Sequence, residues 1–180
     1  MDAIKAIEAR KSVRSYQGRA VEKEKIGTLV MAAKNAPKAG NFHITVITNK
    51  EILGKINDAT LDAMKKSGNE FLMSRAALDG YMPLYGAPVL IMLSAPPEET
   101  FSAVNTACAA TNVCIAATAL GLGSCYVVSP TLTLGPDKEM CRKIGFPEGY
   151  APFCGVLIGY AGEEKFTTER HSPDNVNFYE

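Results

Sequence analysis

The chain has 180 residues, of which 47% are hydrophobic and 21% charged, so its composition is that of a globular domain and excludes a disordered or collagen-like chain. Nineteen basic residues balance nineteen acidic ones, and a formal net charge of zero argues against a dedicated nucleic-acid binder. Five cysteines without a Cys-x-x-Cys pair indicate reduced thiols, and two distant histidines predict no metal site. Because the N-terminal residues lack the apolar core of a signal peptide, we expect a cytoplasmic protein.

Helices and strands are predicted along the whole chain from apolar periodicity, β-branched runs and capping residues. Asp2 caps the first helix, and the second helix ends before Pro37 because the residue preceding a proline avoids the helical conformation. Residues 67–87 combine helical pieces with several Gly and Tyr residues, so their structure stays open. The predicted elements are a helix over 2–9, an extended piece over 10–14, a helix over 22–35, a loop over 37–42, a strand over 43–48, a helix over 50–66, a strand over 89–93, a helix over 102–120, a strand over 124–128, a helix over 137–144 and a strand over 153–160.

The order of these elements has no regular βαβ rhythm, no long linker and no internal repeat. This order predicts an α+β fold with three layers, in which helices flank a central sheet. We expect a single domain over residues 1–180, with a polar C-terminal arm over about 162–180.

The stretch over residues 100–136 contains no charged side chain. Asn, Thr, Gly and Pro residues interrupt it, so we interpret it as a buried helix followed by a buried strand and expect no membrane contact. The helix over 102–120 is apolar nearly all round and consists mainly of small residues, so it should be buried on all sides. It is either a plain core helix or part of a dimer interface.

A basic segment follows the first helix. In an extended chain Arg10, Ser12 and Arg14 point to the same side, about 7 Å apart. Two guanidinium groups and a hydroxyl suit a phosphate group, because arginine can bind phosphate through two hydrogen bonds. The alternative is a solvated basic turn, since short basic runs are common.

The loop over 37–41 could place backbone amides, Asn41 and His43 at the edge of a planar ligand, or it could simply connect a helix to a strand. Gly121–Ser124 ends a helix and is not a dinucleotide-binding fingerprint. The sequence also has no phosphate-binding loop of the GxxxxGK[ST] type, no GxSxG and no HExxH. Basic residues without an evident nucleophile, base or metal cluster fit a protein whose bound cofactor carries the chemistry.

Several segments together resemble one family, the FMN-dependent nitroreductases, and their order and spacing match over nearly the whole chain. The resemblance implies an α+β three-layer fold with a central, mostly antiparallel sheet, built as an intertwined homodimer with two FMN sites at the subunit interface. The segments that carry it are Arg10-x-Ser12-x-Arg14, Ala36–Asn41, Gly86–Ile91, Ala109–Asn112 through Leu120–Cys125, Arg142–Tyr150 and Ile158–Tyr160.

The resemblance also implies roles for individual residues in binding FMN. Lys38 stands where the family often has Ser, His43 where it has Gln or Arg, and Val128-Ser129 where many members have Glu-Gly or a Gly-rich pair. The phosphate and ribityl end would contact Arg10, Ser12 and Arg14, more weakly Lys11, and also Arg170. Pro37, Lys38, Ala39 and Asn41 would reach the flavin from the partner subunit, and His43 is a further cofactor-binding candidate. The backbone amides of Val128 and Ser129 would lie near the flavin N5.

The implied activity is NAD(P)H oxidation by hydride transfer to FMN, followed by reduction of a small electron-poor acceptor such as a nitroaromatic or a quinone. Two alternatives on the same fold are a different specialised flavin reaction and a flavin-binding protein without efficient NAD(P)H turnover. A further alternative is an anion or nucleic-acid binder that uses Arg10 to Arg19, which the zero net charge opposes.

Overall fold

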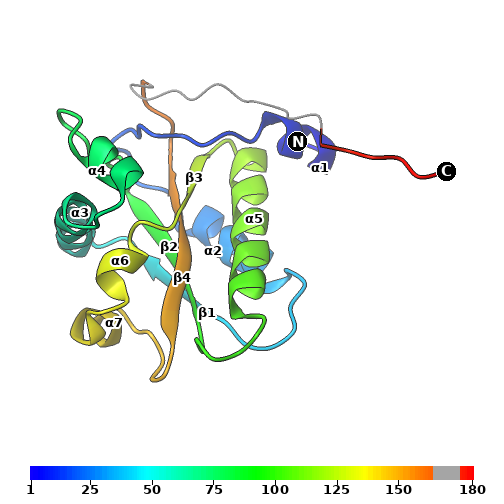
Figure 1. Ribbon diagram of the computed structural model, residues 1–180. Coiled ribbons are helices and arrows are strands. Elements are labelled where there is room, and N and C mark those ends of the chain that lie inside the picture. The colour runs from blue at the N-terminus through cyan, green and yellow to red at the C-terminus, as the bar shows by residue number, and fades with distance from the viewer. Residues whose placement is uncertain (164–174) are drawn as a thin grey trace.

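The computed structural model describes residues 1–163 and 175–180, and Figure 1 shows the arrangement of their helices and strands. Four helices have an N-cap residue whose side chain accepts a hydrogen bond from the backbone N–H three residues later. These N-cap residues are Asp2, Asn49, Asn69 and Asp137. The elements are α1 (Ala3–Ala9), α2 (Lys23–Lys34), β1 (His43–Ile47), α3 (Lys50–Lys65), α4 (Glu70–Ala76), β2 (Val89–Ala95), α5 (Ser102–Ala119), β3 (Gly123–Val127), α6 (Thr131–Leu134), α7 (Lys138–Lys143) and β4 (Ala151–Gly159).

Each predicted helix and strand is present, with ends that differ by no more than two residues. The open segment 67–87 contains α4, and the short helix α6 was not predicted. Its four residues, Thr131–Leu134, follow Pro130 directly and span little more than one turn, too short to show an apolar period.

The four strands form one sheet in the order β1-β2-β4-β3, and every neighbouring pair is antiparallel. The central strand β2 is buried along its whole length, which explains its nearly continuous apolar sequence. Its register places Ile91 opposite Val156 and Leu93 opposite Cys154 of β4. Strands β1 and β3 are therefore the two edges of the sheet.

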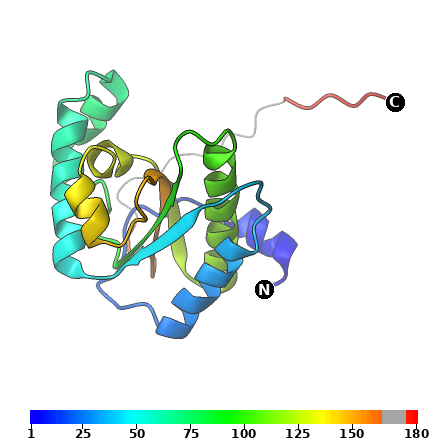
Figure 2. The ribbon, with the colours of Figure 1, turned by 90° about the horizontal axis from the view of Figure 1, so that it is seen from below.

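Alternating side chains of the sheet form two apolar clusters, one on each face. Ile91 and Leu93 of β2 join α2 and α5 on one face, and Leu90 and Met92 join α3, α6 and α7 on the other. Figure 2 shows these helices on opposite sides of the sheet. The predicted three-layer α+β fold is confirmed.

The expectation that the helix over 102–120 is buried on all sides is wrong for a single chain. The face of α5 toward the sheet is buried, but Val104 is 57% exposed, and Ala103, Thr111 and Ala119 are exposed as well. A helix in an outer layer has the sheet on one side only, so a second partner is needed to cover the other side. Within the described residues, no helix is long and apolar enough to cross a membrane.

The chain after α1 is tied to the end of β4 by Tyr160. The Gln17 amide donates to the Tyr160 carbonyl at 2.9 Å, and the Arg19 guanidinium lies 4.0 Å from the Tyr160 ring centre. The Tyr160 hydroxyl accepts from Lys25 at 2.8 Å and donates to a Glu22 carboxylate oxygen at 2.8 Å. This last hydrogen bond is the main reason why the pKa of Glu22 falls to about 2.

The pH dependence of stability tests this arrangement. Because the pKa of Glu22 is lowered in the folded chain, its contribution is present above the unfolded pKa of about 4.3 and is lost as the pH falls toward 2. We expect Tyr160→Phe to lower the urea midpoint at pH 6 and to differ less from the original protein at pH 3. Tyr179→Phe, at an exposed position, is the control; an equal Tyr160→Phe effect at both pH values would contradict the assignment.

Candidate functional site

Residues 10–16 form an extended segment, here called the strap, that lies against the start of β3 and the end of β4. The Val13 amide donates to the Ser124 carbonyl at 2.8 Å, and the Gly162 amide donates to the Ser15 carbonyl at 2.9 Å. Isolated β-bridges join Ser12 to Ser124 and Tyr16 to Ala161. The extended conformation predicted over residues 10–14 is confirmed. The strap runs across the top of the sheet in Figure 1.

Successive side chains of the strap point to opposite sides. Val13 is 3% exposed, and together with Lys11 it lines a hollow of about 170 Å³ near the end of α5. Arg10, Ser12 and Arg14 are half-buried on the other side. The strap can lie this close to β3 because residue 123 is glycine: a Cβ atom there would stand 3.0 Å from both Val13 methyl groups.

On the side of the strap that carries Arg10, Ser12 and Arg14, positive charges act on the thiol of Cys125. Burial raises the pKa of Cys125 on β3, and the Arg14 charge, a hydrogen bond with Ser12 and the Arg10 charge all act in the opposite direction. A further positive charge that acts on Cys125 comes from Arg75 of α4. The structure therefore brings three sequence-predicted residues together, Arg10, Ser12 and Arg14, and adds Arg75 as a third cation that the sequence did not indicate.

Arg75 lies beside Tyr81, in the segment 67–87 whose structure the sequence leaves open. Its guanidinium lies 5.9 Å from the centre of the Tyr81 ring, which packs edge-on against Tyr85 with ring centres 5.8 Å apart. The signal that could have drawn attention to it is composition, because Arg75 is the one basic residue between positions 67 and 87.

The predicted residues Val128 and Ser129 follow β3 at the open edge of the sheet. Val128 is 53% exposed, and its carbonyl accepts from the amide and hydroxyl of Thr131 at 2.9 and 2.7 Å. Among the described residues, no acceptor pairs with the backbone N–H of Val128 or Ser129. These two donors are available to a ligand that lies along β3.

Asn105 of α5 holds the loop over 37–41 through two hydrogen bonds to Ala39. The sequence alone does not indicate this residue. Asn105 is 2% exposed; its carboxamide oxygen accepts from the Ala39 amide at 2.9 Å, and its nitrogen donates to the Ala39 carbonyl at 3.0 Å. Gly40 has φ +117°, and a Cβ there would stand 2.8 Å from a Glu99 carboxylate oxygen. The outer side of the loop, including Lys38, is exposed.

Pro37, Lys38, Ala39, Asn41 and His43 do not join the strap within one chain. His43 begins β1, and β1 and β3 are opposite edges of the sheet. Lys38 and His43 instead line a groove of about 590 Å³ with Lys34, Phe42 and two aliphatic residues of α2 and β1. The sequence-predicted Arg170 lies outside the described residues.

Comparison with known proteins identifies the family. Residues 7–160 match the sequence profile of the Nitroreductase family. A Methanothermobacter thermautotrophicus protein named "Putative NADH dehydrogenase/NAD(P)H nitroreductase" is 29% identical over 98% of this chain and 86% of its own length. FMN-bound nitroreductase structures from Bacteroides fragilis (27% identity, TM-score 0.85) and Desulfitobacterium hafniense (26% identity, TM-score 0.89) each align over 100% of both chains. The chain belongs to the nitroreductase family, as its sequence motifs predict.

The fit between Gly123 and Val13 can be tested by Gly123→Ala. The added Cβ must push the stiff Val13 side chain away, which should weaken the Val13–Ser124 hydrogen bond and cost about 1–3 kcal/mol of stability. We expect faster hydrogen exchange at the Val13 amide. Gly27→Ala is the control, because a Cβ there meets no atom within 4 Å. Unchanged exchange in Gly123→Ala would show that this contact does not hold the strap.

Proposed function

We propose that this protein is an FMN-dependent oxidoreductase that takes electrons from NADH or NADPH and passes them to small electron-poor acceptors such as nitroaromatics or quinones. The observation that carries the proposal is the placement of Arg10, Ser12 and Arg14 on one side of a strap that is bridged to Ser124 at the open edge of β3. Membership of the nitroreductase family and the FMN bound in the two solved relatives support it.

The strap has the chemistry needed for the phosphate end of FMN. Two guanidinium groups can each make paired, charge-assisted hydrogen bonds to phosphate oxygens, and the Ser12 hydroxyl can donate a further one. The three side chains are half-buried, so less water competes for the anion than at an exposed basic turn. Lys11 lies on the other side of the strap, and we assign it no direct contact with the phosphate.

The flavin ring would then lie along β3, toward the unpaired N–H groups of Val128 and Ser129. When bound, FMN supplies the hydride chemistry: the nicotinamide is oxidised to NAD(P)⁺, and a quinone acceptor gains the hydride together with a proton from water. The protein orients the ring and offers hydrogen-bond donors at its edge, so no acidic or basic side chain has to act on the substrate.

We further propose that the active form is a homodimer. The strap and the loop over 37–41 lie at opposite edges of one sheet, so a second chain is needed to bring both to one flavin. Apolar side chains also lack cover in a single chain, including Ile4 of α1 (64% exposed), Val104 of α5, and Phe178 and Tyr179 in the C-terminal segment. That segment leads away from the domain in Figures 1 and 2.

The phosphate assignment predicts different effects at neighbouring positions of the strap. Arg14→Ala should weaken FMN binding about 10- to 100-fold, the effect of losing charge-assisted hydrogen bonds. Lys11→Ala removes the same charge from the other side and should change the Kd by less than about 3-fold. The measurement is a titration of FMN fluorescence with apoprotein. Equal effects of the two variants would show that the strap attracts FMN only through its overall positive charge. A folded Arg10→Ala/Arg14→Ala protein that keeps all its FMN would exclude the assignment of these residues to the phosphate.

The dimer is tested on the open face of α5. We expect sedimentation at micromolar concentration to show a dimer, and Val104→Lys to convert it to a monomer, because a charge would be buried without a partner. Met31→Lys on α2 is a control of similar exposure, 53% against 57%. A monomeric original protein, or a dimer that Val104→Lys leaves intact, would contradict this interface.

A further inference from the structure

A groove with basic and apolar side chains lies between α2, the loop that precedes β1 and β1 itself, and is here called the β1 groove. Its volume is about 590 Å³, which is within the range of pockets that bind small molecules. The residues that line it are Val30, Lys34, Lys38, Phe42, His43 and Ile44. The groove thus combines two lysines and a histidine with an apolar wall.

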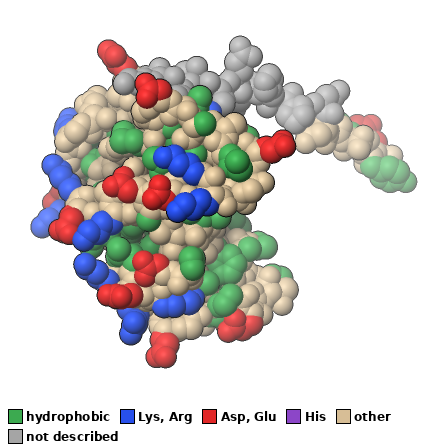
Figure 3. All heavy atoms as spheres, turned by 60° about the vertical axis from the view of Figure 1, so that its left-hand side comes forward, with side chains coloured by type: hydrophobic (Ala, Val, Ile, Leu, Met, Phe, Trp, Pro, Cys, Tyr) green, Lys and Arg blue, Asp and Glu red, His purple; other side chains and the backbone are tan. Residues whose placement is uncertain are grey.

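The basic side chains of the β1 groove have no acidic partner within the described residues. No Asp or Glu lines the groove, and neither Lys34 nor His43 forms an ion pair with the described part of the chain. Elsewhere Lys5, Lys25 and Lys55 each pair with a carboxylate. Figure 3 shows acidic and basic side chains intermixed on the face that carries α3 and α7. In a chain of zero net charge, a groove with unbalanced positive charge indicates a site for an anion.

One carboxylate, that of Glu99, approaches the loop without entering the groove. A Cβ atom at Gly40 would stand 2.8 Å from a Glu99 carboxylate oxygen and 3.5 Å from the side-chain nitrogen of Asn105. Glu99 therefore meets the loop beside Asn105 of α5, and it is not among the residues that line the groove. It leaves the positive charge of the groove open to a ligand.

The apolar wall of the β1 groove is anchored in the core. Phe42 and Ile44 are half-buried and pack against the apolar cluster that α2 and α5 form on the sheet. The Lys38 ammonium lies 5.5 Å from the centre of the Phe42 ring, so a cation and an aromatic surface stand side by side. A flat heteroaromatic ring can lie on such a wall while a phosphate attached to it contacts the lysines. This is the chemistry that a phosphorylated nucleoside requires.

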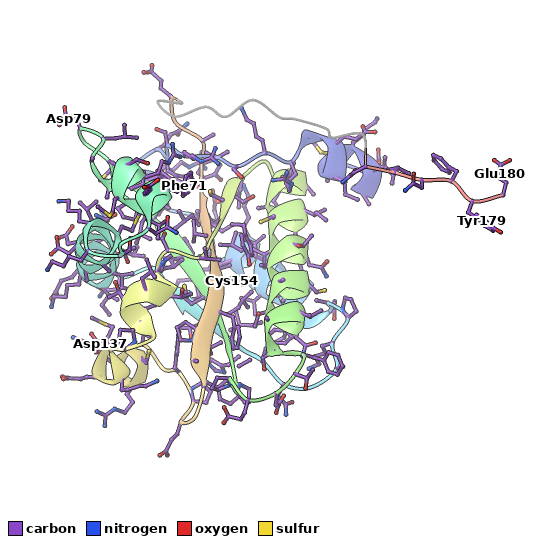
Figure 4. All side chains as sticks on the ribbon, in the orientation of Figure 1. Phe71, Asp79, Asp137, Cys154, Tyr179 and Glu180 are labelled. Atoms are coloured by element: carbon purple, nitrogen blue, oxygen red, sulfur yellow. The ribbon has the colours of Figure 1, made fainter. Side chains whose placement is uncertain are left out.

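The β1 groove also adjoins the loop that the proposed homodimer brings to the flavin of the second chain. NADPH must place its nicotinamide on that flavin, and its adenosine end carries a 2′-phosphate that NADH lacks. Within one chain the groove is not covered by the C-terminal segment, because Figure 4 shows Tyr179 and Glu180 at the end of that segment, away from the domain, and both are exposed. An adenosine phosphate can therefore enter the groove from solvent.

We propose that the β1 groove binds the adenosine 2′-phosphate end of NADPH, with Lys34 and Lys38 on the phosphate and Phe42 beside the adenine. Because NADH has no 2′-phosphate, the groove makes NADPH the preferred electron donor. Lys38 and His43 then serve the nucleotide, and the other predicted residues of the loop serve the flavin. This inference rests on the proposed function and adds the residues that select the donor.

The chain has only two histidines, which permits a direct binding test by proton NMR. In FMN-loaded protein with His171→Gln, His43 gives the only imidazole signals. Titration with 2′,5′-ADP, the phosphorylated adenosine end of NADPH, should shift these signals with saturation. The matched ligand 5′-AMP lacks the 2′-phosphate and should bind at least about 10-fold more weakly. Equal affinities for the two nucleotides, or no shift of the His43 signals, would overturn the proposal.

Kinetics with a fixed concentration of a quinone supply the second test. Lys34→Gln should raise the KM for NADPH about 3- to 10-fold, the effect of losing one charge-assisted hydrogen bond at a partly solvated site, and leave the KM for NADH unchanged. Lys23→Gln removes the same charge from an exposed position at the other end of α2 and should change neither value.

An equal rise of both KM values in Lys34→Gln, or an original protein that uses NADH as efficiently as NADPH, would overturn the proposal. Failure of the proposed function looks different, because the original protein would then bind no FMN or would be reduced by neither nucleotide.

Discussion

The structure depends on one constraint: β2 and β4 must be buried on both faces. Their side chains are apolar on both sides, so each face needs a helical layer, and the two strands must occupy the middle of the sheet. Strands β1 and β3 are left at the edges. Both groups of proposed cofactor contacts lie at these edges, where backbone donors and loops are accessible, and the buried centre serves as their rigid support.

This arrangement explains how a chain without an evident catalytic side chain can still hold a reactive group in place. The strap is fixed to β3 through Val13, which leaves Arg10, Ser12 and Arg14 on the accessible side. The loop over 37–41 is fixed to α5 through Asn105 in the same way. In both cases a contact on one side of a segment determines which groups the other side presents. Binding and orientation are therefore the protein's contribution to the chemistry.

Local patterns were sufficient to predict every helix and strand except α4 and α6, and to nominate part of the candidate site. Period-2 alternation separated Arg10, Ser12 and Arg14 from Lys11, because backbone geometry alone decides which side of a strand each residue faces. Arg75 and Asn105 could not be found in this way. Arg75 matters because α4 packs on α3 in a position from which the Arg75 charge acts on Cys125. Asn105 matters because its partner Ala39 is 66 residues away. Apolar composition likewise could not reveal that one chain leaves a face of α5 uncovered.

We propose that the open edge of β3 holds a flavin that nicotinamide nucleotides reduce. The most direct measurement is the visible absorbance spectrum of the purified protein, recorded anaerobically before and after addition of NADH and then of NADPH. We expect a flavin spectrum that at least one of the two donors bleaches, and recovery of the spectrum when a quinone is added. A flavin spectrum that neither donor bleaches would limit the protein to flavin binding or another flavin reaction. A colourless protein that takes up no added FMN would show that β3 holds no flavin.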